Sequence, residues 1–182
     1  CDEIDCSLIP RGATLCNVHG HEAAVAEYVI LQMLAWRHRT QAAADSFRQG
    51  SWERSSRFGA EPHGELAGST VGIVGFGGIG RALAARLHAF KVRILVANRS
   101  RVDTAPNVDG LHPLDRIDDM FSACDFGVIA IELNDQTRGL IGKRQLTALG
   151  KNGVLVNVAR GPIVDEDALW TCLSNGKLGG AI

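Results

Sequence analysis

Residues 68–101, GSTVGIVGFGGIGRALAARLHAFKVRILVANRSR, decide how this chain folds. They begin with an apolar run at 71–74 whose side chains are largely β-branched, which predicts a buried strand. The glycine-rich segment 75–80 follows, and after it apolar side chains recur at four-residue spacing, as on a helix that packs against a sheet. A second apolar run at 92–97 completes a strand, turn, helix, strand unit.

The turn of this unit has the pattern G-x-G-x-x-G. The first glycine allows a tight turn, the second lets a pyrophosphate approach the backbone, and the third lets the helix lie close to the strand. The N–H groups and the positive dipole end at the helix start favour phosphate. Because a strand precedes the pattern and a helix follows it, we predict a dinucleotide site rather than an ordinary turn. The residues expected to hold the pyrophosphate are Gly75, Phe76, Gly77, Gly78, Ile79 and Gly80.

The composition of the chain bears on its number of domains, its partners and its cellular location. The chain has 182 residues, of which 46% are hydrophobic and 21% charged, as is typical of one globular domain. Its net charge is −1 with no basic stripe, which argues against a nucleic-acid partner. The apolar runs are too short for a membrane partner and no signal-peptide pattern is present, so we predict a cytoplasmic protein. Five cysteines without C-x-x-C spacing are typical of free thiols in a reducing compartment.

Outside the glycine unit, helical and strand patterns continue to alternate, which predicts a Rossmann-type, doubly wound α/β fold with a parallel sheet. His19-Gly20-His21 has no third ligand at metal spacing, so we predict a polar loop there and no metal site. The expected elements are a helix over 22–39, a polar surface segment over 40–68, a loop over 103–112, a short helix over 114–121, a strand over 125–131, a helix over 136–149, a strand over 154–158, a helix over 168–173 and a strand over 178–182.

Several further segments, in the same order, resemble the NAD(P)-binding domain of the D-isomer-specific 2-hydroxyacid dehydrogenases. The resemblance implies that residues 1–18 are the end of a substrate domain and a linker, and that residues 19–182 form the cofactor domain, truncated at its C-terminal end. The family's acid–base His and catalytic Glu would follow residue 182, so we expect the chain by itself to fold but not to turn over substrate. The matching segments are DEID at 2–5, VAEY at 25–28, GELAG at 64–68, QTRGLI at 136–141, NVARG at 157–161 and VDEDAL at 164–169.

The resemblance also implies roles for residues that follow the predicted strands. Arg160 would hold the substrate carboxylate and polarise the 2-oxo group, and a guanidinium is suited to bidentate recognition of a carboxylate. The alternative for Arg160 is a structural ion pair at a strand end. The residues expected beside the cofactor are Ile131, Glu132, Thr137, Val158 and Ala159.

The end of the second strand indicates which cofactor is used. NAD-specific proteins of this fold end that strand in an Asp or Glu that binds the ribose 2′-OH. Here Asn98 does not repel a 2′-phosphate, Arg99 and Arg101 add positive charge, and Ser100 adds a hydrogen-bond donor. We therefore predict that NADP(H) is preferred over NAD(H). The alternative is a pair of solvated arginines with either cofactor accepted.

The implied activity is that of an oxidoreductase, which would transfer a hydride between NADP(H) and a small 2-hydroxy or 2-oxo acid such as glyoxylate or hydroxypyruvate. Formate and phosphite dehydrogenases share the domain and stay open as alternatives, as do corepressors that use the dinucleotide as an assembly ligand. The helix over 22–39, with Tyr28, Met33 and Trp36 on an apolar stripe, predicts a homodimer interface. The alternative is a helix that covers the sheet of its own chain.

The chain departs from the family pattern in three places. After the third strand it has Ala130-Ile131-Glu132, where the family often has His-x-Pro. Lys91 stands in place of a usual glycine, and Pro162 stands in place of a common second glycine after Arg160. These departures bear on the geometry around the cofactor rather than on the fold.

Overall fold

The structure, a computed structural model, describes residues 6–16, 18–51, 63–99 and 105–182. Its strands are short, as expected for strands buried between two layers of helices. They are β1 (Thr70–Val74), β2 (Arg93–Asn98), β3 (Gly110–Pro113), β4 (Phe126–Ile129), β5 (Val154–Asn157) and β6 (Gly180–Ala181).

Six α-helices accompany the strands in the described ranges, together with short 3-10 turns. The first two helices precede the sheet in sequence, and the other four lie between successive strands. They are α1 (Glu22–His38), α2 (Thr40–Arg48), α3 (Gly78–Leu87), α4 (Ile117–Phe121), α5 (Lys143–Leu149) and α6 (Glu166–Ser174).

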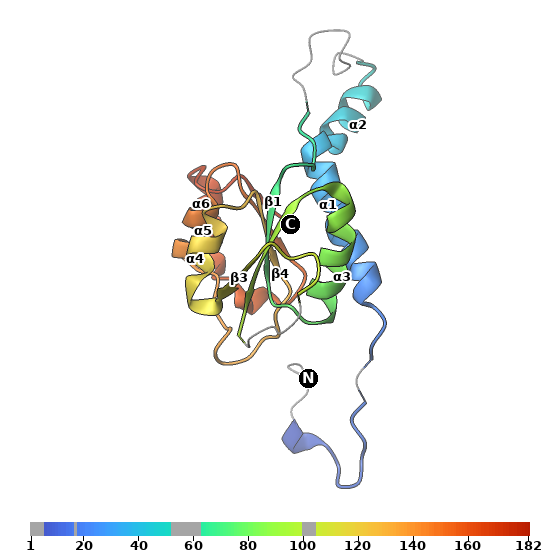
Figure 1. The fold of residues 1–182 in the computed structure, drawn as a ribbon, viewed down its shortest axis with the longest axis vertical. Coiled ribbons are helices and arrows are strands. Elements are labelled where there is room, and N and C mark those ends of the chain that lie inside the picture. Colours follow the sequence, from blue (N-terminus) through green and yellow to red (C-terminus); the bar gives the residue numbers. More distant parts are fainter. Residues whose placement is uncertain (1–5, 17, 52–62, 100–104) are drawn as a thin grey trace.

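All six strands pair in parallel, in the order β3-β2-β1-β4-β5-β6. This is the strand order of a doubly wound dinucleotide-binding fold, so the predicted fold class is confirmed. Figure 1 shows the sheet between two layers of helices, with α1 and α3 on one side and α4, α5 and α6 on the other. Ligands of such sheets bind at the carboxyl ends of the strands.

The two faces of the sheet build two apolar clusters. Successive strand residues point to opposite faces, so Val71 and Ile73 pack with α1 and α3, whereas Val74 packs with α4 and α5. All three side chains are fully buried. Burial on both faces explains why the strands read as continuous apolar runs in the sequence.

One sequence prediction was wrong because local side-chain chemistry broke the expected pattern. The helix expected over 136–149 is confined to α5. Before it, Asn134 accepts hydrogen bonds from the N–H groups of Gln136 and Thr137 at 2.9 and 3.1 Å, which satisfies the backbone in a turn. Gly139 then has φ +65°, outside the helical region. The polar surface segment expected over 40–68 begins with α2, none of whose residues is buried, which agrees with a surface position for that helix.

A second prediction was wrong at the edge of the sheet. The loop expected over 103–112 leads into β3, with residues 103 and 104 outside the described part of the chain. β3 pairs with β2, and Gly110 provides the space that the Leu95 side chain needs, since a Cβ there would lie 2.9 Å from Leu95 Cδ2. The four residues of β3 alternate between intermediate and exposed, and one is a glycine, so their apolar pattern is too weak to predict a strand.

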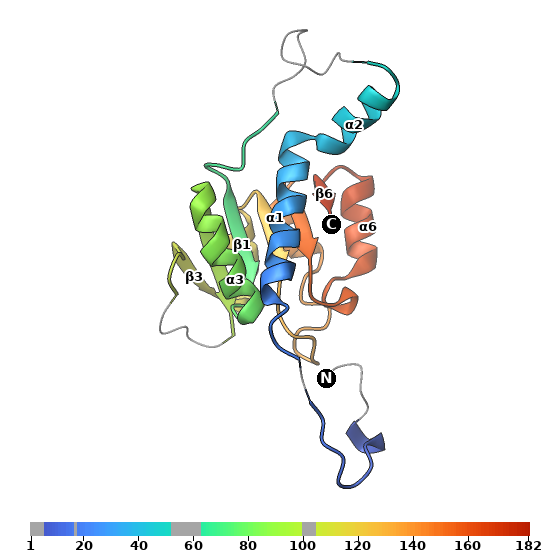
Figure 2. The same ribbon diagram turned by 90° about the vertical axis from the view of Figure 1, so that its right-hand side faces the viewer.

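Helix α1 covers the sheet of its own chain with one face. Ala26, Val29 and Met33 are fully buried there, and the Trp36 ring lies over β6, where a Cβ on Gly180 would come within 2.3 Å of it. Figure 2 shows α1 between α3 and α6. The buried face of this helix therefore covers the sheet of its own chain, as the alternative to a dimer interface predicted. Tyr28 and other apolar side chains on the helix stay exposed.

A polar cluster fixes the C-terminal end of α1 at the amino edge of the sheet. Arg37 forms a 2.8 Å ion pair with Asp125, donates a 3.0 Å hydrogen bond to Ser69 and lies over the Phe126 ring. Asp125 also accepts a hydrogen bond from the N–H of Thr70. One arginine thus connects α1 to the first residues of β1 and β4.

Several features bear on the class of protein. No helix in the described ranges has both the length and the apolar character needed to cross a membrane. Within the same ranges, no three His, Cys, Asp or Glu side chains gather as metal ligands. Cys16, Cys124 and Cys172 are free thiols.

Lys91 has φ +55°, the left-handed conformation for which the family's usual glycine is suited.

Candidate functional site

The glycine loop joins β1 to α3 through two close backbone approaches. Gly75 has φ +96°, and a Cβ on it would lie 2.5 Å from the carbonyl oxygen of Ala130, at the end of β4. A Cβ on Gly80 would lie 2.4 Å from the carbonyl oxygen of Gly75. No real Cβ tolerates such distances, so these two glycines are required for the turn and for the close packing of α3 on β1.

The second glycine of the pattern has a different environment. A Cβ on Gly77 would meet no atom of the described residues within 4 Å. Gly77 is also the N-cap of α3, so the open space adjoins helix N–H groups that have no partner within the helix. An open backbone at this glycine, between two tightly packed ones, fits a pyrophosphate that approaches the loop.

The loop is connected to the end of β2 by Phe76 and Asn98. The Phe76 ring is buried, and its backbone N–H donates a 3.2 Å hydrogen bond to Asn98 Oδ1. Arg99 follows and is exposed. Ser100 and Arg101, which the sequence also assigns to this site, lie outside the described residues.

The loop after β4 carries Ile131, Glu132 and Thr137. Thr137 is only 2% exposed, and its hydroxyl donates to the carbonyl oxygen of Glu132 at 2.7 Å and accepts from the N–H of Asn134 at 2.8 Å. The Thr137 hydroxyl therefore closes the loop that holds Ile131 and Glu132 at the strand end. Asn134, which starts this turn, was missed by sequence reasoning, although Asn is a common turn residue.

The loop after β5 carries Val158, Ala159 and the predicted catalytic Arg160. Asn157 organises this loop, because its Oδ1 accepts from the N–H of Ala159 and its Nδ2 donates to the carbonyl oxygen of Arg160, both at 3.0 Å. The N–H of Val158 donates to the carbonyl oxygen of Ile129 at 3.2 Å, which connects the loop to the end of β4. The Arg160 side chain is exposed. Asn157 was not among the predicted site residues.

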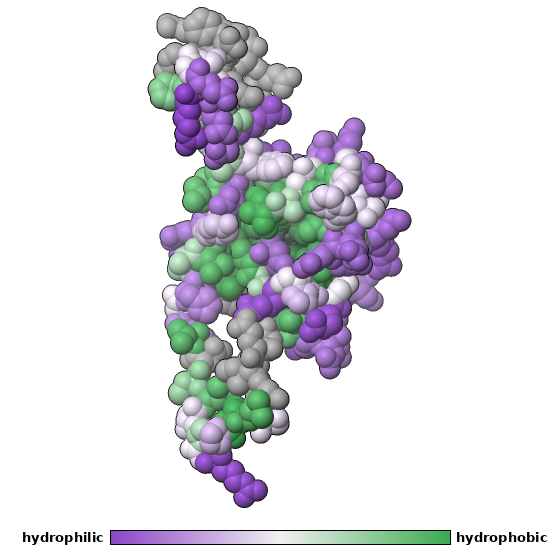
Figure 3. All heavy atoms as spheres, turned by 180° about the vertical axis from the view of Figure 1, so that it is seen from behind, coloured by the Kyte–Doolittle hydropathy of each residue, from purple (hydrophilic) through white to green (hydrophobic). Residues whose placement is uncertain are grey.

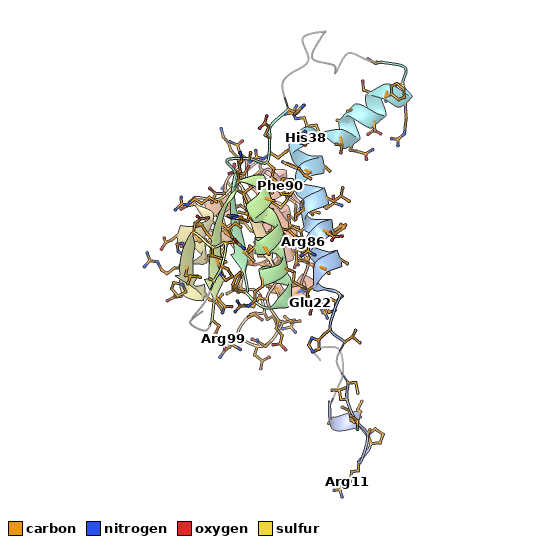
Figure 4. All side chains as sticks on the ribbon, turned by 45° about the vertical axis from the view of Figure 1, so that its right-hand side comes forward. Arg11, Glu22, His38, Arg86, Phe90 and Arg99 are labelled. Carbon is orange, nitrogen blue, oxygen red and sulfur yellow. The ribbon has the colours of Figure 1, made fainter. Side chains whose placement is uncertain are left out.

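These loops meet at one edge of the sheet because all strands run in parallel. β1 lies between β2 and β4, so its carboxyl end is the point at which the strand order reverses. Hydrogen bonds run across this edge, from the N–H of Gly75 to Ala97 and from the N–H of Ala130 to Val74, both at 2.8 Å. Figure 4 shows Glu22 and Arg99 at this end of the domain, far from His38 and Phe90.

Charges of opposite sign flank the glycine loop. Glu22, at the start of α1, lies against Gly78, whose Cβ would be 2.7 Å from Glu22 Cγ. Backbone hydrogen bonds from Glu22 itself and from Gly20 lower the pKa of this carboxyl, so it is charged at neutral pH. On the other side, the Arg81 guanidinium lies over the Phe76 ring. Sequence reasoning missed both charges, although Arg81 directly follows the glycine pattern.

Comparison with known proteins agrees with this geometry. The model of the D-isomer specific 2-hydroxyacid dehydrogenase, NAD binding domain, matches residues 30–182. A glycerate dehydrogenase of Methylorubrum extorquens is 34% identical over 174 residues, which are 94% of this chain and 52% of that protein. A glyoxylate reductase of Thermococcus kodakarensis is 36% identical over 162 residues, which are 87% of this chain and 48% of that protein. The chain spans about half the length of these relatives.

Solved structures have the same fold. An NADPH-dependent glyoxylate/hydroxypyruvate reductase of Sinorhizobium meliloti, in complex with NADP and malonate, is 36% identical with a TM-score of 0.76, over 88% of this chain and 49% of that one. A Granulicella formate dehydrogenase is 27% identical with a TM-score of 0.78, over 88% of this chain and 43% of that one.

Proposed function

The chain belongs to the D-isomer specific 2-hydroxyacid dehydrogenase family, and from that premise we propose that the whole protein is an oxidoreductase acting on a small 2-hydroxy or 2-oxo acid. Glyoxylate and hydroxypyruvate are the proposed substrates, in keeping with the named relatives. The observation that carries the proposal is the open backbone at Gly77, on the sheet edge that also carries Arg160.

Each part of the site has a task in this proposal. When bound, the nicotinamide cofactor supplies or accepts the hydride. Gly75, Gly77 and Gly80 bring the α3 N-terminus to the pyrophosphate. Arg160 holds the substrate carboxylate through two N–H groups, while Asn157 orients its loop. Val158 and Ala159, and on the other side Ile131 and Glu132, line the cofactor.

We further propose that NADP(H) is preferred over NAD(H). Asn98 supports this, because its side chain is uncharged and its amide nitrogen is a hydrogen-bond donor, while its Oδ1 accepts a hydrogen bond from Phe76. A donor suits a 2′-phosphate, whereas the carboxylate of an NAD-specific site repels it. Arg99, with Ser100 and Arg101 beyond the described residues, would add two cations and a hydroxyl.

The domain boundary stays a proposal as well. Residues 1–18 are assigned to the end of a substrate domain and a linker, and residues 19–182 to the cofactor domain. In Figure 1 the described part of the first segment extends away from the sheet and its helices, in keeping with a connection to another unit. The acid–base His and the catalytic Glu of the reaction are assigned to the rest of the whole protein.

Cofactor binding by this chain and turnover by the whole protein test the proposal separately. The chain should bind NADP⁺ in calorimetry, and the whole protein should oxidise NADPH with glyoxylate or hydroxypyruvate. The similarity to a formate dehydrogenase makes formate with NAD(P)⁺ the second substrate to assay. Binding without turnover of any of these acids by the whole protein would favour the corepressor alternative. Failure to bind either dinucleotide would overturn the proposal.

A homodimer is proposed for the whole protein, with α1 in the interface. Tyr28 is 48% and Leu31 60% exposed on the outer side of this helix, although both are large apolar side chains. Figure 3 shows hydrophobic residues collected on the face opposite to that of Figure 1. Leu31→Glu should shift sedimentation of the whole protein toward monomer without lowering its melting temperature. A wild-type monomer at high concentration would contradict this proposal.

We propose a cytoplasmic location on the basis of the thiols. Cys124 and Cys172 are buried as free thiols, and Cys16 is an exposed one. Free thiols of this kind persist in a reducing compartment. Recovery of the protein from a periplasmic or extracellular fraction would contradict this location.

A further inference from the structure

Arg81 is held in place beside the glycine loop by an aromatic ring. It lies on α3 directly after the third glycine, and its guanidinium carbon is 4.6 Å from the centroid of the Phe76 ring. Phe76 itself is buried at 4% exposure, so the ring is a rigid support, whereas Arg81 is exposed. A cation at this distance from an aromatic face is attracted by the ring quadrupole.

The same ring connects Arg81 to the end of β2. Phe76 donates its backbone N–H to Asn98, the residue at which the adenosine ribose is expected. Arg81 and Asn98 therefore both contact Phe76, one through its ring and the other through its backbone, although they are 17 positions apart in the sequence. Through Phe76, the arginine on α3 and the residue that ends β2 are connected by two direct contacts.

The position of Arg81 is unfavourable for the helix by itself. Positive charge is disfavoured near a helix N-terminus, and the first turn of α3 contains no acidic residue. The charge that balances the loop comes from Glu22, which lies against Gly78 on the side of α1. The loop thus has a negative group against Gly78 and a positive group against Phe76.

We propose that Arg81 is a specificity-determining residue that pairs with the 2′-phosphate of NADP(H). The inference rests on the dinucleotide site proposed above and adds a cation from α3 to those that follow β2. A guanidinium carries its N–H donors in a planar fork, which suits bidentate contact with phosphate oxygens. If Arg81 only stabilised Phe76, its removal would change the stability of the domain and not the choice of cofactor.

Binding measurements on the 182-residue chain test this role. Calorimetry would compare wild type, Arg81→Ala, Arg81→Lys and Arg86→Ala with NADP⁺, NAD⁺, 2′,5′-ADP and 5′-AMP. Arg86 is the matched control, since it lies on the same helix and pairs with Glu27 instead. We expect Arg81→Ala to weaken NADP⁺ and 2′,5′-ADP about tenfold or more, as for the loss of one charge-assisted hydrogen bond, and to leave NAD⁺ and 5′-AMP within about twofold.

The variants also separate charge from geometry. Arg81→Lys should recover part of the lost NADP⁺ affinity, because it keeps the charge but not the planar fork. If Arg81→Ala lost equal affinity for NADP⁺ and NAD⁺, or lost affinity for neither, the role of Arg81 would be overturned. Binding by the wild type would still uphold the dinucleotide site. Wild-type protein that bound neither dinucleotide would overturn the site and this inference together.

Discussion

Asn98 Oδ1 accepts a hydrogen bond from the backbone N–H of Phe76 at 3.2 Å, so the end of β2 and the glycine loop are joined by a side chain. The bond assigns the two ends of the Asn98 amide, since only the oxygen can accept from an N–H. An aspartate at this position could accept the same bond. The difference between the two side chains is therefore one of charge and not of loop structure.

Asn98→Asp is predicted to reverse the cofactor preference without harming the fold. The carboxylate keeps the bond to Phe76, repels a 2′-phosphate and accepts from a ribose 2′-OH. The ratio of NADP⁺ to NAD⁺ affinity should fall by about tenfold or more in titrations of the chain. Asn107→Asp is the control, because it adds the same charge at an exposed position before β3 that tolerates a left-handed φ. An unchanged ratio in Asn98→Asp would contradict the prediction.

Substitutions at two glycines of the motif are predicted to have different effects, one on stability and the other on cofactor binding. A Cβ on Gly80 would meet the Gly75 carbonyl oxygen, so Gly80→Ala should lower the free energy of unfolding by about 1–3 kcal/mol. A Cβ on Gly77 would point into open space, so Gly77→Ala should change stability by about 0.5 kcal/mol at most and weaken NADP⁺ binding about tenfold or more. Urea unfolding and calorimetry on both variants distinguish the two effects. Tight NADP⁺ binding by Gly77→Ala would be inconsistent with a phosphate at that glycine.

Arg160→Lys in the whole protein is predicted to impair the oxo-acid step selectively. Lysine keeps the charge but loses the bidentate fork, so kcat/KM for glyoxylate should fall about 100-fold. The Kd for NADPH should stay within about twofold, because the phosphates are expected at the glycine loop. Arg144→Lys, which alters an ion pair with Asp118 on the helix layer, serves as control. A loss of NADPH affinity as large as the loss of kcat/KM would point instead to a structural ion pair at Arg160.

Cys124 is predicted to be chemically inert in the folded protein. Burial, and secondarily the neighbouring charge of Asp125, raise the pKa of its thiol to about 12, and the thiol donates a hydrogen bond to the Met120 carbonyl oxygen. Iodoacetamide at pH 8 should therefore alkylate the exposed Cys16 and spare Cys124 until the protein is unfolded. Peptide mass spectrometry reads both sites in one sample. Equal labelling of the two in the native protein would show that this end of β4 opens readily.

The same thiol should make stability depend on alkaline pH. In the unfolded chain the thiol loses its proton near its ordinary pKa of 9.0, whereas in the folded chain it keeps it up to about 12. The contribution of this thiol to the free energy of unfolding is thus fully present below pH 9 and is lost as the pH rises toward 12. Relative to Cys124→Ser, wild type should lose about 1 kcal/mol of unfolding free energy between pH 9 and pH 10. A pH-independent difference between the two would exclude this linkage.

Much of the fold could be read from residues that are neighbours in the chain. The glycine unit from β1 through α3 to β2 was predicted within one or two residues, because the apolar period and the glycine spacing are local properties. The doubly wound class followed from the alternation of such units. The helix predicted over 136–149 does not extend over the first half of that range, because Asn134 and Thr137 offer the backbone a competing set of hydrogen bonds.

The sequence by itself determined the parallel sheet, its glycine loop and the residues that follow each strand. Only the tertiary structure decided which of them meet and what surrounds them. It brought Trp36 over Gly180, Glu22 against Gly78 and Arg81 onto Phe76, and it turned the Thr137 hydroxyl into its own loop. The reason is that burial, close backbone approach and the pairing of charges depend on segments that are distant in the chain, whose contacts no local pattern records.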